Sequence, residues 1–166
     1  MSDRVVAHQG AACWATLFTH AHYLPCLAVL LQSMRACQTR YPLVVMLTET
    51  VDARTRERLA RMGCVLRDVD AWRVPHADGS LAFERFQNVW TKLRAFELYE
   101  HERVVMIDSD MLMCHNMDEL FDLPLERGMI AAAFACTCNP KQIPTYPAEW
   151  TPRNCGYALR PHPPND

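Results

Sequence analysis

The chain has 166 residues, half of them apolar, which is enough for one globular domain with a sizeable core. Its 17 basic and 19 acidic residues are interspersed and give a formal net charge of −2, so no basic stripe favours nucleic acid or an anionic membrane. No signal-peptide run begins the chain, and nowhere do about 18 uncharged apolar residues follow one another. We therefore expect a cytoplasmic α/β domain without nucleic-acid or membrane partners.

The first seventy residues predict three strands that alternate with two helices. Residues 14–19 form a short β-rich run, and a stripe of leucines at i, i+3, i+4 and i+7 predicts a core-facing helix over 23–39. Residues 43–47 have no polar alternation, as expected of a strand that is buried on both faces. A helix over 52–63 starts with an aspartate as N-cap and stops at a glycine, and 64–69 is the third strand. This order favours a parallel sheet covered by helices.

The next seventy residues predict a long loop and four further elements. The loop covers 71–88, a length that is usually functional. The spacing of Val89, Leu93 and Phe96 predicts a helix through about Tyr99. The remaining expectations are a strand from residue 103 that runs into two carboxylates, a short capped helix over 116–122 and a strand over 129–134.

The end of the chain differs in composition, because seven of the eleven prolines fall between Pro140 and Pro164. Such a segment cannot form a helix or a central strand. We expect two domains, a nucleotide-binding one over 1–135 and an irregular segment over 136–166 that leads to a second half beyond this chain.

The eight cysteines are scattered, and most lie inside apolar stretches where cysteine acts as a small hydrophobic residue. The one close pair is Cys136 and Cys138, and a second pair at metal-site spacing is missing. Reduced thiols are the expectation. A cysteine-based metal or redox module around this pair stays open as a hypothesis that stoichiometric zinc would favour.

The residues most informative about chemistry are Asp108 and Asp110, which directly follow an apolar strand. Open α/β sheets bind their ligands at the carboxyl ends of strands. Two carboxylates there can hold a hard divalent cation, which in turn neutralises a diphosphate. The alternative interpretation is a solvated turn in which one aspartate caps the following residues.

Four segments together resemble the central block of glycosyltransferase family 8, which includes glycogenin and galactinol synthase. They are residues 15–23, 90–98, 104–113 and 116–121, in the family's order and spacing. Residues 135–141 and 146–150 look most like fungal and plant members. The resemblance covers roughly residues 14–135 and implies the N-terminal part of a GT-A-like, Rossmann-like fold with a largely parallel sheet, truncated at its C-terminus.

Carried over by position, the resemblance implies a binding site for a UDP-sugar and Mn²⁺. Asp108 and Asp110 would ligate the metal, with Ser109 between them in place of the more usual alanine. Lys92 would lie near the sugar donor or the diphosphate. The uracil and ribose pocket would be lined by Leu17, Thr19, His20 and Tyr23, where His20 replaces the asparagine of many relatives.

Each of these residues also has an ordinary structural interpretation. Leu17 and Thr19 can be strand residues, Tyr23 can pack on the core, and Lys92 can be a solvated charge. His115 beside the carboxylates is best read as a surface histidine, and Arg85 as a loop arginine that faces water.

The function that the resemblance implies is transfer of a sugar from a UDP-sugar to a hydroxyl acceptor, with retention of anomeric configuration and Mn²⁺ on the diphosphate. No catalytic residue is assigned, because the family's acceptor-side carboxylate segment and C-terminal histidine motif have no counterpart here. The alternative is a catalytically silent fragment that at most binds nucleotide. An exposed apolar face would favour a homo-oligomer.

Overall fold

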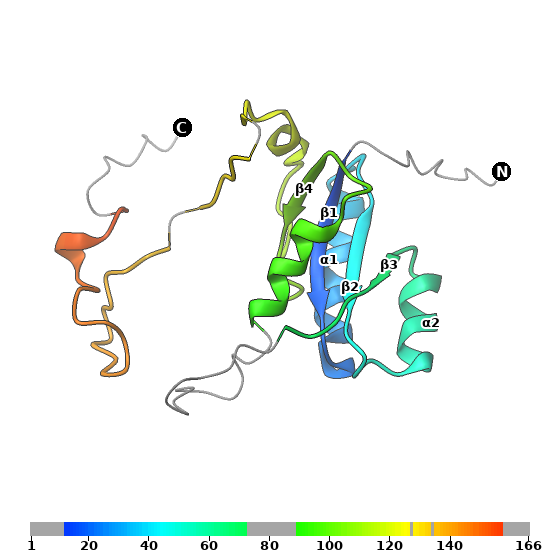
Figure 1. The fold of residues 1–166 in the computed structure, drawn as a ribbon, viewed down its shortest axis with the longest axis horizontal. Coiled ribbons are helices and arrows are strands. Elements are labelled where there is room, and N and C mark those ends of the chain that lie inside the picture. Colours follow the sequence, from blue (N-terminus) through cyan, green and yellow to red (C-terminus); the bar gives the residue numbers. More distant parts are fainter. Residues whose placement is uncertain (1–11, 73–88, 127, 134, 158–166) are drawn as a thin grey trace. The chain divides into compact units, whose positions relative to one another are not determined.

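The computed structural model describes residues 12–72, 89–126, 128–133 and 135–157. The chain divides into two compact units, Met1–Leu123 and Pro124–Asp166. The first unit contains the sheet and its helices, and the second has little regular structure (Figure 1). The assignment of domains over 1–135 and 136–166 stays a prediction.

The first unit is built on a four-stranded sheet in which all neighbours are parallel. The strands are β1 (Ala12–Phe18), β2 (Leu43–Leu47), β3 (Val65–Asp68) and β4 (Arg103–Met106). Their order is β3-β2-β1-β4, so both central strands are buried along almost their whole length. This confirms the predicted α/β class with a parallel sheet, which is consistent with a GT-A-like fold.

Two α-helices follow β1 and β2. A short 3₁₀ helix, η1 (Ala21–Tyr23), leads into α1 (Leu24–Ala36), which ends before Gln38, whose φ of 55° cannot continue a helix. The predicted helix over 23–39 was therefore three residues too long at its end. α2 (Ala53–Arg61) is capped as predicted, because Asp52 accepts a bond of 2.9 Å from the Thr55 amide. That bond holds the pKa of Asp52 below its usual range.

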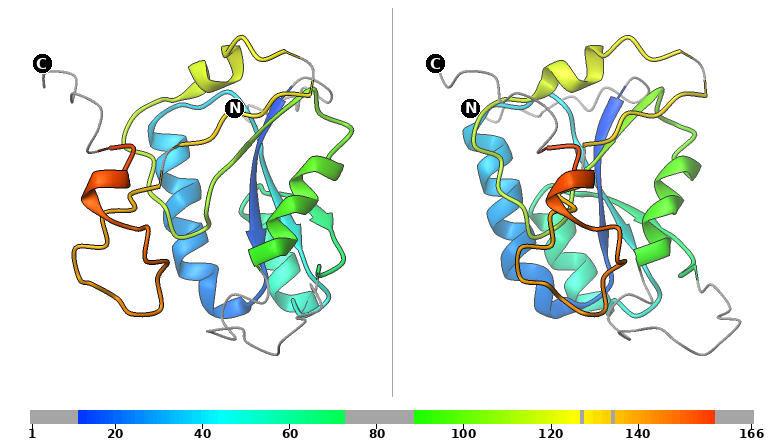
Figure 2. Two further views of the ribbon diagram at one scale, coloured as in Figure 1. Left: turned by 60° about the vertical axis from the view of Figure 1, so that its left-hand side comes forward. Right: turned by 90° about the vertical axis from the view of Figure 1, so that its left-hand side faces the viewer.

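Each face of the sheet carries its own hydrophobic cluster. Trp14 and Phe18 of β1 point to the face covered by α1 and α2, where they pack with Leu27, Leu30 and Leu59. Cys13 and Ala15 point to the other face, where they pack with Leu98, the residue just after the helix η3 (Val89–Glu97). The views in Figures 1 and 2 show η3 alone on this second face among the described helices. The alternation along β1 thus sorts its side chains between two helical layers.

The helix η3 is 3₁₀ in type, whereas the sequence predicted an α-helix. With three residues per turn, side chains at i and i+3 eclipse one another and form three rows. One row contains Thr91 and Arg94 and is held by residues 70 and 72. Thr91 Oγ1 accepts from Trp72 N at 3.0 Å, and Arg94 Nε donates to Asp70 O at 3.1 Å. These contacts tie η3 to residues that precede its own by 19 and 24 positions.

The other two rows of η3 have opposite environments. One row contains Lys92, Ala95 and Leu98, of which the last two pack in the core. The other row contains Trp90, Leu93, Phe96 and, just after the helix, Tyr99, all of them exposed. Val89, Leu93 and Phe96, whose spacing predicted the helix, do not form a buried stripe, because they are 43%, 38% and 61% exposed.

Further expectations need correction. The capped helix predicted over 116–122 is a 3₁₀ helix, η4 (Asp118–Asp122). The strand predicted over 129–134 is not formed in 128–133, where the described side chains are exposed and no strand pairs with them; Phe134 lies outside the described residues. The third strand is shorter at both ends than the predicted 64–69. In the proline-rich segment, as expected, the described part contains one 3₁₀ turn, η5 (Pro152–Asn154).

None of the helices within the described ranges combines the length and the apolar character needed to cross a bilayer.

Candidate functional site

The strand order reverses its direction between β1 and β4. From β1 the chain moves outward to β2 and β3, and it then crosses back to β4 on the opposite side of β1. Such a reversal separates the connections that leave two neighbouring strands, and open α/β sheets bind ligands at this point, beyond the carboxyl ends. Any group that directly follows β1 or β4 therefore stands at the expected ligand position.

Asp108 stands at this position because of the register between the two strands. Ala15 of β1 pairs with Met106 of β4, and the amide of Ile107 donates to Ala15 O at 2.9 Å. Asp108 is two residues beyond Met106, as Leu17 is two residues beyond Ala15. The carboxylate of Asp108 thus begins the loop at the level where β1 still has one more residue to run.

Lys92 reaches this carboxylate from η3. Its Nζ lies 2.6 Å from Asp108 Oδ1, and both side chains are partly exposed. Two residues that the sequence placed in one site, 16 positions apart, therefore form an ion pair. The ordinary interpretation of Lys92 as a solvated charge does not describe this contact.

Ser109 and Asp110 form the turn that follows. The amide of Met111 donates to Asp108 O at 3.2 Å, which closes the turn around both residues. Asp110 is exposed, and among the described residues its carboxylate has no hydrogen-bond or ion-pair partner. Its oxygens are available to a cation from solvent.

The chain after the turn is fastened to the end of α1. Met113 is buried, and its amide donates to Ser33 Oγ at 3.0 Å. Asn116 Nδ2 donates to the carbonyls of Cys37 and Gln38 at 3.0 and 3.1 Å. These bonds hold the chain on the C-terminal side of the turn that contains Asp110.

Asp118, which the sequence analysis assigned no role of its own, is the central group of this fastening. Its carboxylate accepts from Thr39 Oγ1 and, at 2.9 Å, from the amide of Arg40. Burial alone would raise the pKa of Asp118, but the bonds from Thr39 and Arg40 outweigh it and lower the pKa. The partners are 78 and 79 residues away, so only the fold reveals them.

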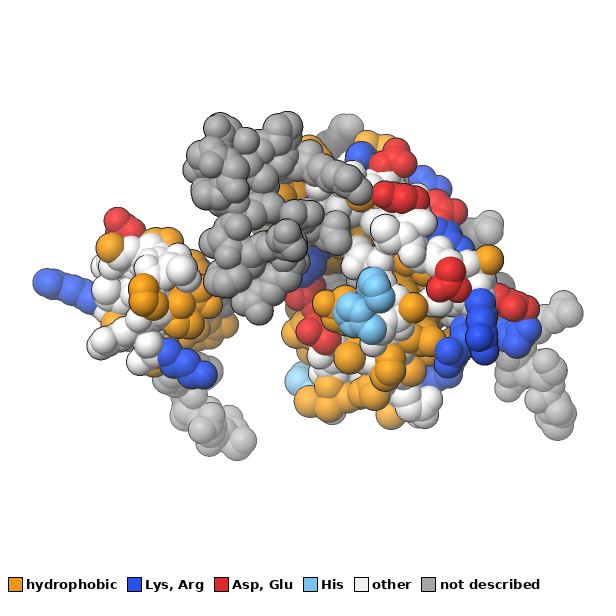
Figure 3. Space-filling view, turned by 90° about the horizontal axis from the view of Figure 1, so that it is seen from below, with side chains coloured by type: hydrophobic (Ala, Val, Ile, Leu, Met, Phe, Trp, Pro, Cys, Tyr) orange, Lys and Arg blue, Asp and Glu red, His pale blue; other side chains and the backbone are white. Residues whose placement is uncertain are grey.

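The segment after β1 contains the residues predicted to meet the nucleotide base. The rings of His20, His22 and Tyr23 form a row of tilted contacts, with centroid distances of 4.2 and 4.1 Å. Figure 3 shows histidine side chains gathered beside acidic and hydrophobic ones on the face below the strand ends of Figure 1. A partly exposed row of rings is a surface on which a planar base can stack.

The individual roles of these residues are mixed. His20 Nδ1 accepts from the amide of His22 at 3.3 Å and so caps η1, while Thr19 O accepts from Thr50 Oγ1 at 2.6 Å. Leu17 packs in the second hydrophobic cluster, as its ordinary interpretation expected. Tyr23 is 39% exposed and does not belong to the core.

Two other residues considered in the sequence, His115 and Arg85, are not part of the described site. His115 is exposed, as the surface interpretation expected. Arg85 and most of the predicted loop over 71–88 lie outside the described residues.

A depression lies at the ends of β2 and β3. Its lining includes Glu49, Arg56, Asp68 and Asp70. Arg56 pairs with Asp68 and donates to the carbonyls of Val51 and Thr48 at 2.9 and 3.0 Å. These bonds tie α2 to the sheet, so we assign Arg56 a structural role.

Sequence comparison finds relatives of this chain among plant proteins. Galactinol synthase 5 of Arabidopsis thaliana is 30% identical over 140 residues, which are 83% of this chain and 41% of that protein. Galactinol synthase 2 of Solanum lycopersicum is 31% identical over 110 residues, 66% of this chain and 32% of that protein. The chain thus spans less than half the length of these curated relatives, and no family model matches it. The chain is a distant homologue of galactinol synthases, which are members of glycosyltransferase family 8.

Proposed function

We propose that this chain forms the donor-binding part of a glycosyltransferase and binds a UDP-sugar together with Mn²⁺. The observation that carries the proposal is the placement of Asp108 just after β4, where the strand order reverses, and its pairing with Lys92 at 2.6 Å. The homology to galactinol synthases supports the same reaction class.

The two aspartates have the donor atoms that such a cation prefers. Carboxylate oxygens suit Mn²⁺, which keeps water and phosphate oxygens in its remaining positions. Asp108 offers the oxygen that Lys92 does not contact, and Asp110 is exposed to solvent. A bound Mn²⁺ would act as a Lewis acid on the diphosphate leaving group.

The protein's own groups have distinct tasks in this proposal. Lys92 holds Asp108 in place and brings one positive charge to the edge where the diphosphate would lie. The exposed rings of His20 and Tyr23, each in contact with His22, offer a face for uracil next to the end of β1. The fastening through Asp118 keeps the carboxylate turn in position.

The first experiment is calorimetric titration of the purified chain with UDP, with and without Mn²⁺. We expect binding that depends on Mn²⁺ and that the Asp108→Asn, Asp110→Asn double variant loses. The matched control is Asp122→Asn, an exposed aspartate of η4 outside the turn, which should bind as the parent chain does. Equal binding by the parent and the double variant would refute the assignment of the two aspartates.

The same titration separates binding from turnover. A folded chain that binds UDP but releases no sugar from a UDP-sugar in the presence of hydroxyl acceptors would fit the silent alternative. UDP-galactose is the first donor to test, because the relatives are named for making galactinol. The expected product of an active chain keeps the anomeric configuration of the donor.

A further inference from the structure

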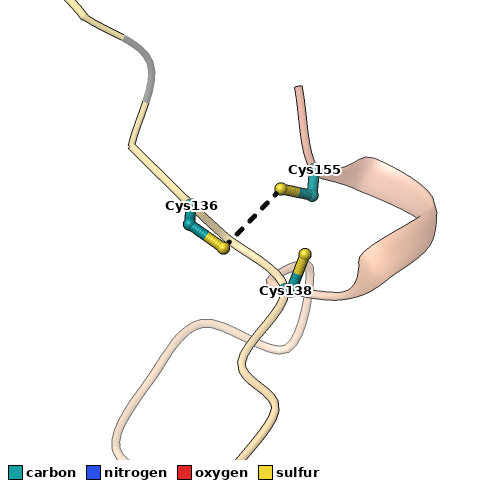
Figure 4. A group of neighbouring side chains, drawn as sticks. All are labelled: Cys136, Cys138 and Cys155. Carbon is teal, nitrogen blue, oxygen red and sulfur yellow. Dashed lines mark hydrogen bonds between the residues drawn. The ribbon is translucent and has the colours of Figure 1, made fainter. Parts of the chain in front are cut away.

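Three cysteines of the second unit bring their sulfur atoms together (Figure 4). The Sγ atoms of Cys136, Cys138 and Cys155 all lie within 4.8 Å of one another. The Cys155 thiol contacts the Cys136 sulfur at 4.0 Å. Around a tetrahedral zinc ion with Zn–S bonds of about 2.3 Å, two sulfurs are about 3.8 Å apart. The cluster therefore already has nearly the spacing that one zinc ion requires.

We propose that Cys136, Cys138 and Cys155 bind one Zn²⁺ as three thiolates, with water as the fourth ligand. Thiolate sulfur is a ligand that zinc prefers, and the binding needs no oxidant or reductant. The ion displaces three thiol protons, so the complex carries a charge of −1 and three protons enter solvent. Cys138 also borders a cavity of about 590 Å³ in the same unit, which offers space for the water ligand.

Local backbone structure presents the three thiols to one another. Asn139 follows Cys138 with a φ of 42°, and its Oδ1 accepts from the amide of Ile143 at 2.8 Å. Asparagine tolerates this left-handed conformation better than most residues, and the bond fixes the turn. On the other side, the turn η5 ends at Cys155, whose amide donates to Pro152 O at 3.3 Å. Both sulfur-bearing segments are thus held by bonds of their own.

The second unit needs such a link because it has almost no core. Among its described residues, Cys155 is the only buried one. The ring contact between Tyr146 and Trp150, at 4.8 Å, lies within one short stretch and does not join the two cysteine segments. Units of this size usually depend on disulfides or a structural metal. A zinc ion would link Cys136 to Cys155, which are 19 residues apart in the sequence, at the buried Cys155 side chain.

The first test measures metal on the whole chain. The purified protein is stripped of metal under reducing conditions and titrated with Co²⁺, which takes the place of Zn²⁺ and gives a sulfur-to-cobalt charge-transfer band. We expect saturation at one ion per chain, and loss of the band when one equivalent of Zn²⁺ is added. Absence of the band would overturn the proposal.

Variants and an internal control identify the ligands. Cys138→Ser and Cys155→Ser should each weaken Co²⁺ binding at least about tenfold, whereas Cys26→Ser and Cys114→Ser, at exposed thiols of the first unit, should leave it unchanged. If a variant does not fold, alkylation of the parent chain still decides. Bound Zn²⁺ should protect the three cluster thiols from alkylation, while Cys26 and Cys114 react with or without it.

The buried thiols of the first unit do not complicate the alkylation experiment. Burial raises the pKa of Cys13 to about 12 and that of Cys64 to about 11, so neither reacts readily in the folded protein. Equal alkylation of the cluster with and without Zn²⁺ would refute the site. A Cys136–Cys155 disulfide that forms in place of metal binding, and whose reduction restores no Co²⁺ band, would refute it as well. The proposal concerns the second unit alone and does not depend on nucleotide binding.

Discussion

Replacing Asp118 by asparagine tests how the turn that contains the two site carboxylates is held in place. The substitution keeps the shape of the side chain but removes its charge and one of its acceptor oxygens. The bonds at stake come from Thr39 Oγ1 and the Arg40 amide, and hydrogen bonds to a charged group are worth about 1.5–3 kcal/mol each. The additional ion pair with the Arg40 side chain adds little, because that side chain is 71% exposed. We expect Asp118→Asn to lower the free energy of unfolding by about 2–3 kcal/mol.

Urea unfolding followed by circular dichroism measures this loss. With a slope of about 2 kcal/mol per molar urea, the midpoint should fall by about 1 M at pH 7. The matched control is Asp122→Asn, an exposed aspartate of the same helix η4, which should change the free energy of unfolding by less than about 0.5 kcal/mol. Identical midpoints for the two variants would refute the role of Asp118.

The pH dependence adds a check on the sign. The folded pKa of Asp118 is lowered, whereas its unfolded pKa is about 3.9. Its contribution is therefore fully present above about pH 4 and is lost as the pH falls through the folded pKa. The difference between the parent and Asp118→Asn should be constant near neutrality and shrink below about pH 4. A difference that grows in acid would contradict this reasoning.

Four further outcomes are expected. Leu27→Ala, at a fully buried position of α1, should cost about 2–5 kcal/mol in urea unfolding. Gly63→Ala should cost about 1–2 kcal/mol in the same assay, because the glycine has a φ of 87°; an unchanged midpoint would count against this. Lys92→Met should weaken Mn²⁺-dependent UDP binding about tenfold by calorimetry, and Lys92→Arg should retain more of it. Trypsin cleavage after the exposed Lys141 and Arg153, followed by mass spectrometry, should slow when Zn²⁺ is added and stay fast with Mg²⁺.

The sequence predicted the sheet well because buried parallel strands are nearly continuous apolar runs. The strand over 43–47 has the predicted bounds, and the strands near residues 14 and 103 begin or end within about two residues of their predictions. Asp52 as N-cap and Gly63 as helix stop were also predicted, since both depend on local backbone chemistry.

The errors arose where distant contacts decide the local structure. The helix after residue 88 has a 3₁₀ spacing, and its Thr91 and Arg94 bond to residues 72 and 70, contacts that local periodicity does not reveal. The run over 129–133 is apolar enough for a strand, but a strand forms only where a neighbour pairs with it.

The candidate site shows the same division. The position of Asp108 was predictable because a carboxylate directly after an apolar strand lies at the carboxyl end of the sheet. The resemblance placed Lys92 near the sugar donor or the diphosphate, but its ion pair with Asp108 was not predicted. The roles of Asp118 and Cys155 were not predicted, since their partners lie 78 and 19 residues away.

The 3₁₀ form of η3 makes the site depend on the core through helical phase. Leu98 is buried while Lys92, two turns earlier in the same row, contacts Asp108. A 3₁₀ helix advances about 120° per residue and an α-helix about 100°, so over these six residues the two forms diverge by about 120°. If η3 rewound as an α-helix with Leu98 anchored, Lys92 would turn a third of a revolution away from the carboxylate. The winding of one short helix thus sets whether the positive charge of Lys92 lies beside Asp108.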